Sequence, residues 1–191
     1  MIKIDRASLD QEVYDTLFER SSIQEFRANE VVVGIGSMCN YLFFIEKGML
    51  RNFYFDQKGN DITHWFACED MITTVPPSFF NQEPSIFGIE AVENTTARVL
   101  TRSQLEEGFQ RSIALERFVR LLTTNIMIAL GKKIVALQTM SAEDRYDELI
   151  KTYPDIFRRA KLGHIAGYLG VKQQSLSRIR TLKRTNDQFL T

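Results

Sequence analysis

The chain has 191 residues, of which 44% are hydrophobic and 25% charged, and its 24 Lys and Arg balance 24 Asp and Glu. Such a composition is typical of a globular protein with one large domain or two small ones. The polar N-terminus has no signal-peptide core and no apolar run reaches the length of a bilayer, which predicts a cytoplasmic protein with no membrane partner. Cys39 and Cys68 are expected to be free thiols, since they form no CxxC pair and are too few for an iron–sulfur cluster.

The charge is divided unevenly along the chain. Residues 1–144 carry 14 Lys and Arg against 20 Asp and Glu, a net charge of −6, whereas residues 145–191 carry 10 against 4, a net charge of +6. A basic C-terminal segment on an acidic body concentrates the attraction for phosphate groups in that segment. The distribution therefore favours a nucleic-acid partner for the C-terminal part.

Residues 7–22 have apolar side chains at helical spacing and are predicted to form a short amphipathic helix. Residues 23–108 are instead rich in β-branched and aromatic runs, separated by turn residues such as Gly48, Gly59 and the pair Pro76–Pro77. Many short strands at this spacing predict a jelly-roll or double-stranded β-roll. The predicted strands are Val31–Val33, Tyr41–Ile45, Leu50–Phe55, Ile62–Phe66, Ile86–Ile89 and Ala97–Leu100.

A long helix is predicted over residues 111–139, where apolar residues recur at spacings of three and four. A helix of this length spans roughly 43 Å, which is long for a domain of this size. It has two apolar rows, so we expect one row to face the β-roll and the other to face a second copy of the chain. Burial of both rows within one subunit is the alternative. The first row is Leu115, Val119, Leu122, Ile126, Leu130, Ile134 and Leu137, and the second is Phe118, Leu121, Ile128 and Val135.

A C-terminal module is predicted to begin at residue 141. Ser141 and Asp144 form a loose capping box, which ends the long helix and starts another. Pro154 ends that next helix, because proline cannot continue it. The interval that follows Pro154 is short, so any β-wing in this region is expected to be reduced.

Residues 162–180 have the pattern of a helix-turn-helix, with an apolar pair on each of two short helices. Gly170 lies between the helices, where a sharp turn needs a residue that tolerates positive φ. With the apolar pairs inward, the Gln and Arg side chains of the second helix point outward and can pair with adenine and guanine in a major groove. The alternative is a packed α-hairpin whose polar face is only solvated. The apolar pairs are Ile165 with Leu169 and Leu176 with Ile179.

Several segments together resemble a known family: residues 41–51 (YLFFIEKGMLR), 58–63 (KGNDIT), the long helix, 141–146 (SAEDRY), 165–170 (IAGYLG) and 176–180 (LSRIR). Over nearly its whole length the chain resembles the Crp/Fnr superfamily of bacterial transcription regulators, in the form common in Bacteroidetes. The resemblance implies an α+β fold with three parts. These are a cyclic-nucleotide-binding-type β-roll over residues 1–110, a dimerisation helix over 111–140 and a winged-helix-type helix-turn-helix module with a reduced wing over 141–191.

The resemblance also implies partners and DNA-binding residues. The partners are double-stranded DNA, a second copy of the chain and RNA polymerase. Lys172 stands where the family usually has a Ser or Thr N-cap, and lysine opposes the helix dipole unless a phosphate meets it. Gln174 stands where glutamate is frequent, which shifts the expected preference from cytosine toward adenine. By position, Gln173, Gln174 and Arg178 are expected to read bases, Lys172, Ser175 and Arg180 to lie nearer phosphates, and Ser177 to share the outward face.

The expected effector site departs from the family pattern. Members that bind cyclic nucleotides have a Gly-Glu pair for the ribose and an Arg-Ser or Arg-Thr pair for the phosphate. Here the equivalent regions are Cys68–Met71 and Gln82–Ile86, and residues 60–96 contain no Lys or Arg. A buried phosphate without a cation is costly, so cyclic AMP is not the expected ligand and an unidentified small molecule is the candidate effector. The candidate pocket residues are His64, Phe66, Glu69, Ser85 and Leu130.

Three alternative functions fit the sequence less well. A metal-dependent enzyme of the cupin type needs about three converging His or carboxylate ligands, whereas His64 is the only histidine of the β-rich segment, so no enzyme, metal or cofactor is expected. A redox- or haem-responsive regulator of the same fold stays open through Cys39, Cys68 and His64. A protein-interaction module without DNA binding is opposed by the polar helix face and the local charge of +6.

Overall fold

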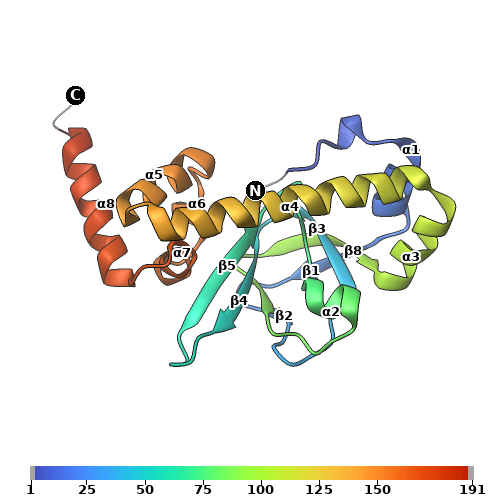
Figure 1. The fold of residues 1–191 in the computed structure, drawn as a ribbon, viewed down its shortest axis with the longest axis horizontal. Helices are drawn as coiled ribbons and strands as arrows, with labels where there is room; N and C mark the ends of the chain where they lie inside the picture. The colour runs from blue at the N-terminus through green and yellow to red at the C-terminus, as the bar shows by residue number, and fades with distance from the viewer. Residues whose placement is uncertain (1–2, 189–191) are drawn as a thin grey trace.

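A computed structural model describes residues 3–188, with side chains described as far as residue 183. A β-roll forms the body of the molecule, and the long helix α4 (Ile113–Thr139) runs along it (Figure 1). The N-terminal helices lie at one end of α4, and a helical C-terminal module lies at the other. Among the described residues, no helix is long and apolar enough to cross a membrane.

The N-terminal helical segment is shorter than the predicted span of 7–22. A 3-10 turn at Arg6–Ser8 precedes the helix α1 (Gln11–Tyr14), which continues as a π-type turn over Asp15–Glu19. Asp10 is the N-cap of α1, and its side chain accepts a hydrogen bond from the Glu12 N–H at 3.0 Å. The polar strand β1 follows directly, which is why the helix stops early.

The predicted β-roll is confirmed as two four-stranded antiparallel sheets. Strand order in the first sheet is β1-β8-β3-β6, and in the second it is β2-β7-β4-β5. Strands β1 and β6 were not among the predicted runs, because β1 is mostly exposed and β6 has only two residues. The strands are β1 (Ser22–Phe26), β2 (Val31–Val33), β3 (Tyr41–Lys47), β4 (Leu50–Phe55), β5 (Asp61–Ala67), β6 (Ile72–Thr73), β7 (Gly88–Ala91) and β8 (Thr95–Thr101).

The pair Pro76–Pro77 does not form the predicted turn. Helix α2 (Pro76–Asn81) begins there, with proline in its first turn. Proline has no N–H to leave unpaired at that position and its φ already suits a helix, so the pair starts the helix. Gln82 ends α2 in the left-handed conformation, with φ of 58°.

The predicted helix over 111–139 is divided near its start. Helix α3 (Arg102–Arg111) ends at Ser112, and α4 begins one residue later. Ser112 has an extended backbone, and its side chain accepts a hydrogen bond from the Leu115 N–H, so it caps α4. The division turns the chain so that α3 packs beside α4 at the end of the β-roll.

Helix α4 is buried only near its beginning. Leu115 is fully buried, and Phe118, Val119 and Leu122 pack against the core formed by the N-terminal helices and the first sheet. Beyond this point both predicted rows are largely solvent-exposed within one chain. The exposed apolar side chains are Leu121 (46%), Met127 (65%), Ile128 (49%), Leu130 (37%), Ile134 (56%), Val135 (56%) and Leu137 (41%).

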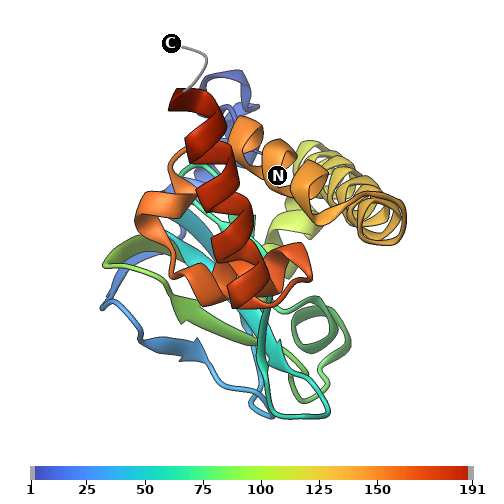
Figure 2. The ribbon, with the colours of Figure 1, turned by 90° about the vertical axis from the view of Figure 1, so that its left-hand side faces the viewer.

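The C-terminal module contains helices α5 (Ala142–Thr152), α6 (Ile156–Arg159), α7 (Leu162–Leu169) and α8 (Gln173–Gln188). The capping box predicted at Ser141 and Asp144 is present at the start of α5. From residue 141 to 188 the structure has no strand, and the short helix α6 occupies the interval where a reduced wing was expected. In Figure 2 the module lies at the front of the molecule, with α8 nearest the viewer.

Candidate nucleic-acid interface

Helices α7 and α8 form the predicted helix-turn-helix. Gly170 has φ of +67° and ends α7 in the left-handed conformation, where the Val171 N–H bonds the Ala166 carbonyl at 3.0 Å. Leu176 is fully buried and Ile179 nearly so, and both belong to the core cluster that also holds the α7 side chains. The buried pairs therefore fix which side of α8 faces solvent.

The outward side of α8 carries the residues predicted to contact DNA. Arg178 forms no ion pair or hydrogen bond with any described residue, so its guanidinium is available to a ligand. Helix α8 lies at the end of the molecule that Figure 2 turns toward the viewer. The exposed residues of the face are Lys172, Gln173, Gln174, Ser175, Ser177, Arg178 and Thr181.

Arg180 is placed differently from the other predicted DNA-binding residues. It is half-buried, and its guanidinium carbon lies 5.2 Å from the centre of the Phe157 ring. Its side chain also bonds Tyr146, whose pKa is raised because burial outweighs that bond. Arg180 thus packs against the module itself, since a 100° step per residue turns it away from Arg178.

A groove of about 1100 Å³ lies beside the start of α8. One wall is the turn between β4 and β5, which includes Asp56, together with the start of β5 at Asp61. The opposite walls are α4 and the α7–α8 turn, where Gln173 and Gln174 reach the groove. The groove therefore connects the β-roll, the long helix and the first turn of α8.

Lys133 joins three elements at this groove. Its Nζ donates to the carbonyl oxygen of His64 on β5 at 2.6 Å and lies 3.7 Å from the centre of the Tyr168 ring on α7. Burial lowers the pKa of Lys133 to about 7, because the ammonium is removed from water. Burial and then the charge of Lys133 lower the pKa of His64 to about 4, so this imidazole is neutral at pH 7.

The five predicted effector-pocket residues do not converge on the groove. Only His64 and Leu130 line it. Phe66 is fully buried with its ring 5.5 Å from Tyr168, Ser85 donates to the carbonyl oxygen of Phe87, and the Glu69 carboxylate bonds Arg159 of α6. Three of the five therefore belong to packing or to the contact between the β-roll and the C-terminal module.

Arg51 on β4 is the deeply buried arginine of the β-roll, with 1% of its surface exposed. Its guanidinium is bound by Asp61 at 2.5 Å and by Glu90 at 3.1 Å, and it also donates to the Thr63 hydroxyl at 3.0 Å. Although burial opposes the charge, these partners raise the pKa of Arg51 above its ordinary value. Its charge is already exceeded by that of two carboxylates, so it does not offer a free cation for a phosphate.

The thiols are also enclosed. Cys39 and Cys68 are both buried and unbridged. Burial raises the pKa of the Cys68 thiol, with the carboxylate of Glu69 adding to the rise, and its Sγ lies 3.5 Å from the Met71 sulfur. The raised pKa makes Cys68 a poor nucleophile, and Cys39 is enclosed in the core, so neither thiol has the exposed surroundings of a redox sensor. In residues 3–188, no group of three or more His, Cys, Asp or Glu could hold a metal ion.

Both the β-roll and the chain as a whole are similar to known proteins. Residues 23–112 match the family described as the cyclic nucleotide-binding domain. The chain is similar in structure to FixK2 from Bradyrhizobium japonicum, with a TM-score of 0.74 and 18% identity over 87% of this chain and 86% of that one. It has no significant match among curated protein sequences.

Two further structures show the same arrangement. The c-di-GMP-responsive global regulator CLP of Xanthomonas campestris has a TM-score of 0.68 and 11% identity over 93% of both chains. A transcriptional regulator of the Crp/Fnr family from Eubacterium rectale has a TM-score of 0.70 and 15% identity over 94% of this chain and 86% of that one. The chain therefore has the fold of the Crp/Fnr transcription regulators, as its sequence predicted.

The sequence did not reveal the residues that hold the C-terminal module on the β-roll. Arg159 and Lys133 each make contacts with residues far away in the chain, and a charged residue on a helix normally indicates a solvated surface. Lys133 could have been suspected of such a contact, because it lies in a mostly apolar region of α4. The partners of Arg159 lie 66 to 111 residues earlier, so no local pattern marks them.

Proposed function

We propose that the protein is a homodimeric, sequence-specific DNA-binding transcription regulator. The observation that carries the proposal is the exposed Gln, Ser and Arg face of α8, held outward by the buried pair Leu176 and Ile179. Arg178 and Gln174 would read bases in the major groove, and Lys172 would meet a phosphate at the start of the helix. The fold shared with transcription regulators supports the same conclusion.

The exposed apolar side of α4 supports a second copy of the chain as the dimer partner. Leu121, Ile128 and Val135 follow one another at intervals of seven residues, and each is exposed by 46% or more. A seven-residue repeat brings side chains to one seam between two helices. A twofold dimer also suits a palindromic site with half-sites about one helical turn apart. RNA polymerase remains a further proposed partner through the fold resemblance.

We propose that the β-roll does not use cyclic AMP as its effector. Residues 60–96 supply no Lys or Arg, and Arg51 is bound by Asp61 and Glu90. A phosphate placed beside that cluster would meet two carboxylates, and leaving it unpaired costs several kcal/mol. A less charged small molecule is the effector class that fits these residues.

The test of DNA recognition is selection of binding sites from random duplexes, followed by titration of two variants. Arg178→Ala is expected to lower specific affinity by about 1–3 kcal/mol and to relax the preference at one base position. Lys172→Ala is expected to weaken all sequences alike and to reduce the salt slope by about 1. Arg111→Ala is the matched control, because it removes an exposed arginine from α3 at the opposite end of the molecule.

Two results would contradict the proposal. If the wild-type protein selects no sequence from the random pool, it is not a sequence-specific DNA-binding protein. If it selects a sequence but Arg178→Ala binds it as wild type does, the face of α8 assigned here is not the one that reads bases. Arg111→Ala should match wild type in either case.

A further inference from the structure

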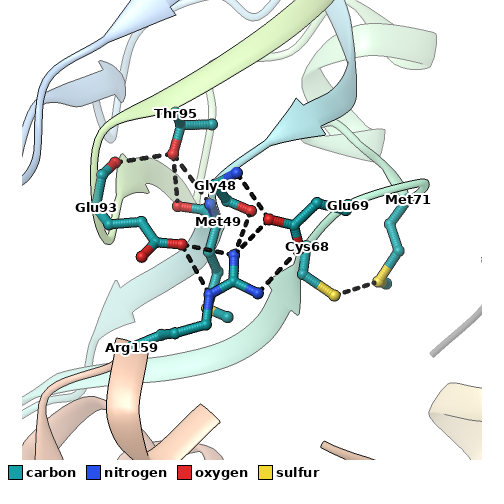
Figure 3. Close-up of polar contacts among 8 residues, drawn as sticks. All are labelled: Gly48, Met49, Cys68, Glu69, Met71, Glu93, Thr95 and Arg159. Carbon is teal, nitrogen blue, oxygen red and sulfur yellow. Dashed lines mark hydrogen bonds and ion pairs between the residues drawn. The ribbon is translucent and has the colours of Figure 1, made fainter. Parts of the chain in front are cut away.

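One arginine of the C-terminal module is held by three residues of the β-roll (Figure 3). Arg159, at the end of α6, donates through Nη1 and Nη2 to the two carboxylate oxygens of Glu69 at 2.9 and 2.8 Å. Its Nε and Nη2 donate to Glu93 at 2.8 and 2.5 Å, and Nη2 also donates to the Gly48 carbonyl oxygen at 2.8 Å. Planar, bidentate pairing of this kind fixes orientation as well as distance.

The β-roll builds the receiving site, here called the acidic cup (Gly48, Glu69 and Glu93). The Gly48 N–H donates to Glu69 at 2.9 Å, and the Thr95 hydroxyl donates to the Glu93 carbonyl oxygen at 2.8 Å. Gly48 has φ of +96°, and a Cβ there would lie 2.6 Å from the Thr95 hydroxyl oxygen, so only glycine fits. These backbone contacts fix where the cup's carboxylates stand.

The charges of the cup agree with this geometry. Two carboxylates face one guanidinium, and the hydrogen bond from Arg159 lowers the pKa of Glu69 even though burial opposes the lowering. Glu69 and Glu93 likewise raise the pKa of Arg159. The Arg159 side chain is 22% exposed and each carboxylate 35%, so water screens the pair only in part.

The contacts of Arg159 with the acidic cup, here called the clamp, connect the β-roll to the C-terminal module close to where the long helix meets that module. Only Met140 and Ser141 separate α4 from α5. The module also contacts the body through α7 on β5, through a buried apolar cluster that its helices share with the β-roll, through Lys133, and through a hydrogen bond from Lys161 to Asn29 at 2.5 Å. Among these contacts, that of Arg159 pairs a guanidinium with two carboxylates through several hydrogen bonds. With the module held this way, α8 lies at the end of the molecule (Figure 2), and its predicted DNA-contacting residues are exposed.

We propose that Arg159 is a positioning residue for DNA binding. Its clamp on the acidic cup fixes the C-terminal module on the β-roll in the orientation that presents α8, so that the two α8 helices of a dimer engage two half-sites at once. This inference rests on the proposed function above. It assigns to Arg159 no contact with DNA, since all of its donors are directed at the β-roll.

The physical reason is that a dimer gains affinity from engaging both half-sites together. Once one module is bound, the second meets its half-site at an effective concentration set by how well its position is fixed. Without the Arg159 contacts the module keeps its apolar contacts with the β-roll, but its orientation is fixed less narrowly. Loss of the clamp should therefore weaken binding to two half-sites while leaving each single contact intact.

The experiment compares full-length variants on two duplexes, one with both selected half-sites and one with a single half-site. Arg159→Gln is expected to weaken two-half-site binding about tenfold or more and to change half-site binding less than about threefold. Arg158→Gln is the matched control, because it removes the same charge from the neighbouring residue, which is 80% exposed and, among the residues that the structure describes, pairs with Asp155 alone. Exchange of the two charges, Arg159→Glu with Glu93→Arg, is expected to recover part of the loss.

Amide hydrogen exchange gives a readout that does not involve DNA. Exchange should be faster around Gly48 and in α6 for Arg159→Gln, while it should match wild type for Arg158→Gln, because the Gly48 N–H bonds a carboxylate that Arg159 holds. If Arg159→Gln proves unfolded by circular dichroism, Glu93→Gln takes its place, since it removes one partner and leaves Glu69 bound. The same two duplexes are then used.

The outcomes separate this inference from the proposed function. If wild type selects no sequence, the proposed function fails and this inference falls with it. If wild type binds both duplexes, the inference is overturned when Arg159→Gln leaves both affinities unchanged, weakens both equally, or strengthens two-half-site binding. Strengthening would mean that the clamp restrains the module in a form that does not bind DNA.

Discussion

Alanine at Gly167 is predicted to separate α7 from the β-roll without harming α7 itself. A Cβ at this position would lie 3.0 Å from the Thr63 backbone nitrogen and 3.4 Å from the Ile62 Cα on β5. These are backbone atoms of a strand, so they cannot move aside as the end of a side chain can. The close approach of α7 to β5 therefore depends on the missing side chain.

Gly163 on the same helix supplies a matched control. A Cβ there meets only the Gln173 side-chain oxygen, at 3.1 Å, which is the end of a flexible side chain. Each Gly-to-Ala change favours the helix by about 1 kcal/mol, while forcing a methyl group into a close-packed contact costs about 1–3 kcal/mol. Gly163→Ala should gain only the stability from helix propensity. Gly167→Ala should gain the same amount and lose the cost of the packing clash with β5.

The expected result is that Gly167→Ala is less stable than Gly163→Ala by about 1–3 kcal/mol. Urea denaturation followed by circular dichroism measures this difference, and a thermal melt should show it as about 2–4 °C per kcal/mol for a chain of this size. A second, separate transition in Gly167→Ala alone would show the C-terminal module unfolding independently. Equal stabilisation by the two alanines would refute the reasoning, because it would mean that α7 does not lie against β5 in solution.

Three further predictions follow from single features of the structure. Ile128→Glu on the exposed side of α4 should shift the sedimentation coefficient from dimer to monomer, while Thr123→Glu, on a polar exposed position, should not. The pKa of Lys133 is about 7 in the folded protein, against an ordinary value of 10.5. Between pH 7 and 10 the unfolded protein therefore holds a proton at Lys133 that the folded protein has released, so the free energy of unfolding rises with pH. Urea denaturation should show wild type gaining stability relative to Lys133→Met by at most about 1.4 kcal/mol per pH unit. A flat difference would contradict the burial of this ammonium. Calorimetry with cyclic AMP and cyclic GMP should show no binding tighter than about 10 μM, and tighter binding would contradict the argument from the missing cation.

The sequence predicted the elements whose side chains alternate between core and solvent in a regular period. Each predicted run in the β-rich segment contains or overlaps a strand, and Leu176 and Ile179 proved to be the buried side of α8. The misses have a common cause. Strand β1 buries only Phe26, β6 has two residues, and α2 begins on prolines, so none of them shows the period of its own structure.

In the candidate site too, some residues could be predicted from a local pattern and others could not. The outward face of α8 follows from helical geometry alone, because the position of two apolar residues fixes the direction of the rest. Arg180 was expected near a phosphate from the family resemblance alone, and helical geometry instead turns it away from Arg178 toward Phe157. The pocket residues could not be predicted from alignment of short motifs, because Glu69 has a partner on α6 that only the tertiary fold brings near.

The uneven charge of the chain serves two separate purposes in the folded protein. Arg159 faces carboxylates of the acidic body, whereas Lys172 and Arg178 are exposed and have no carboxylate partner among the described residues. Added salt should therefore act unequally on the two sets of cations, since exposed charges are screened more strongly than half-buried ones. DNA affinity should fall steeply with salt through the exposed cations, while the preference for two half-sites over one should persist for as long as the clamp holds.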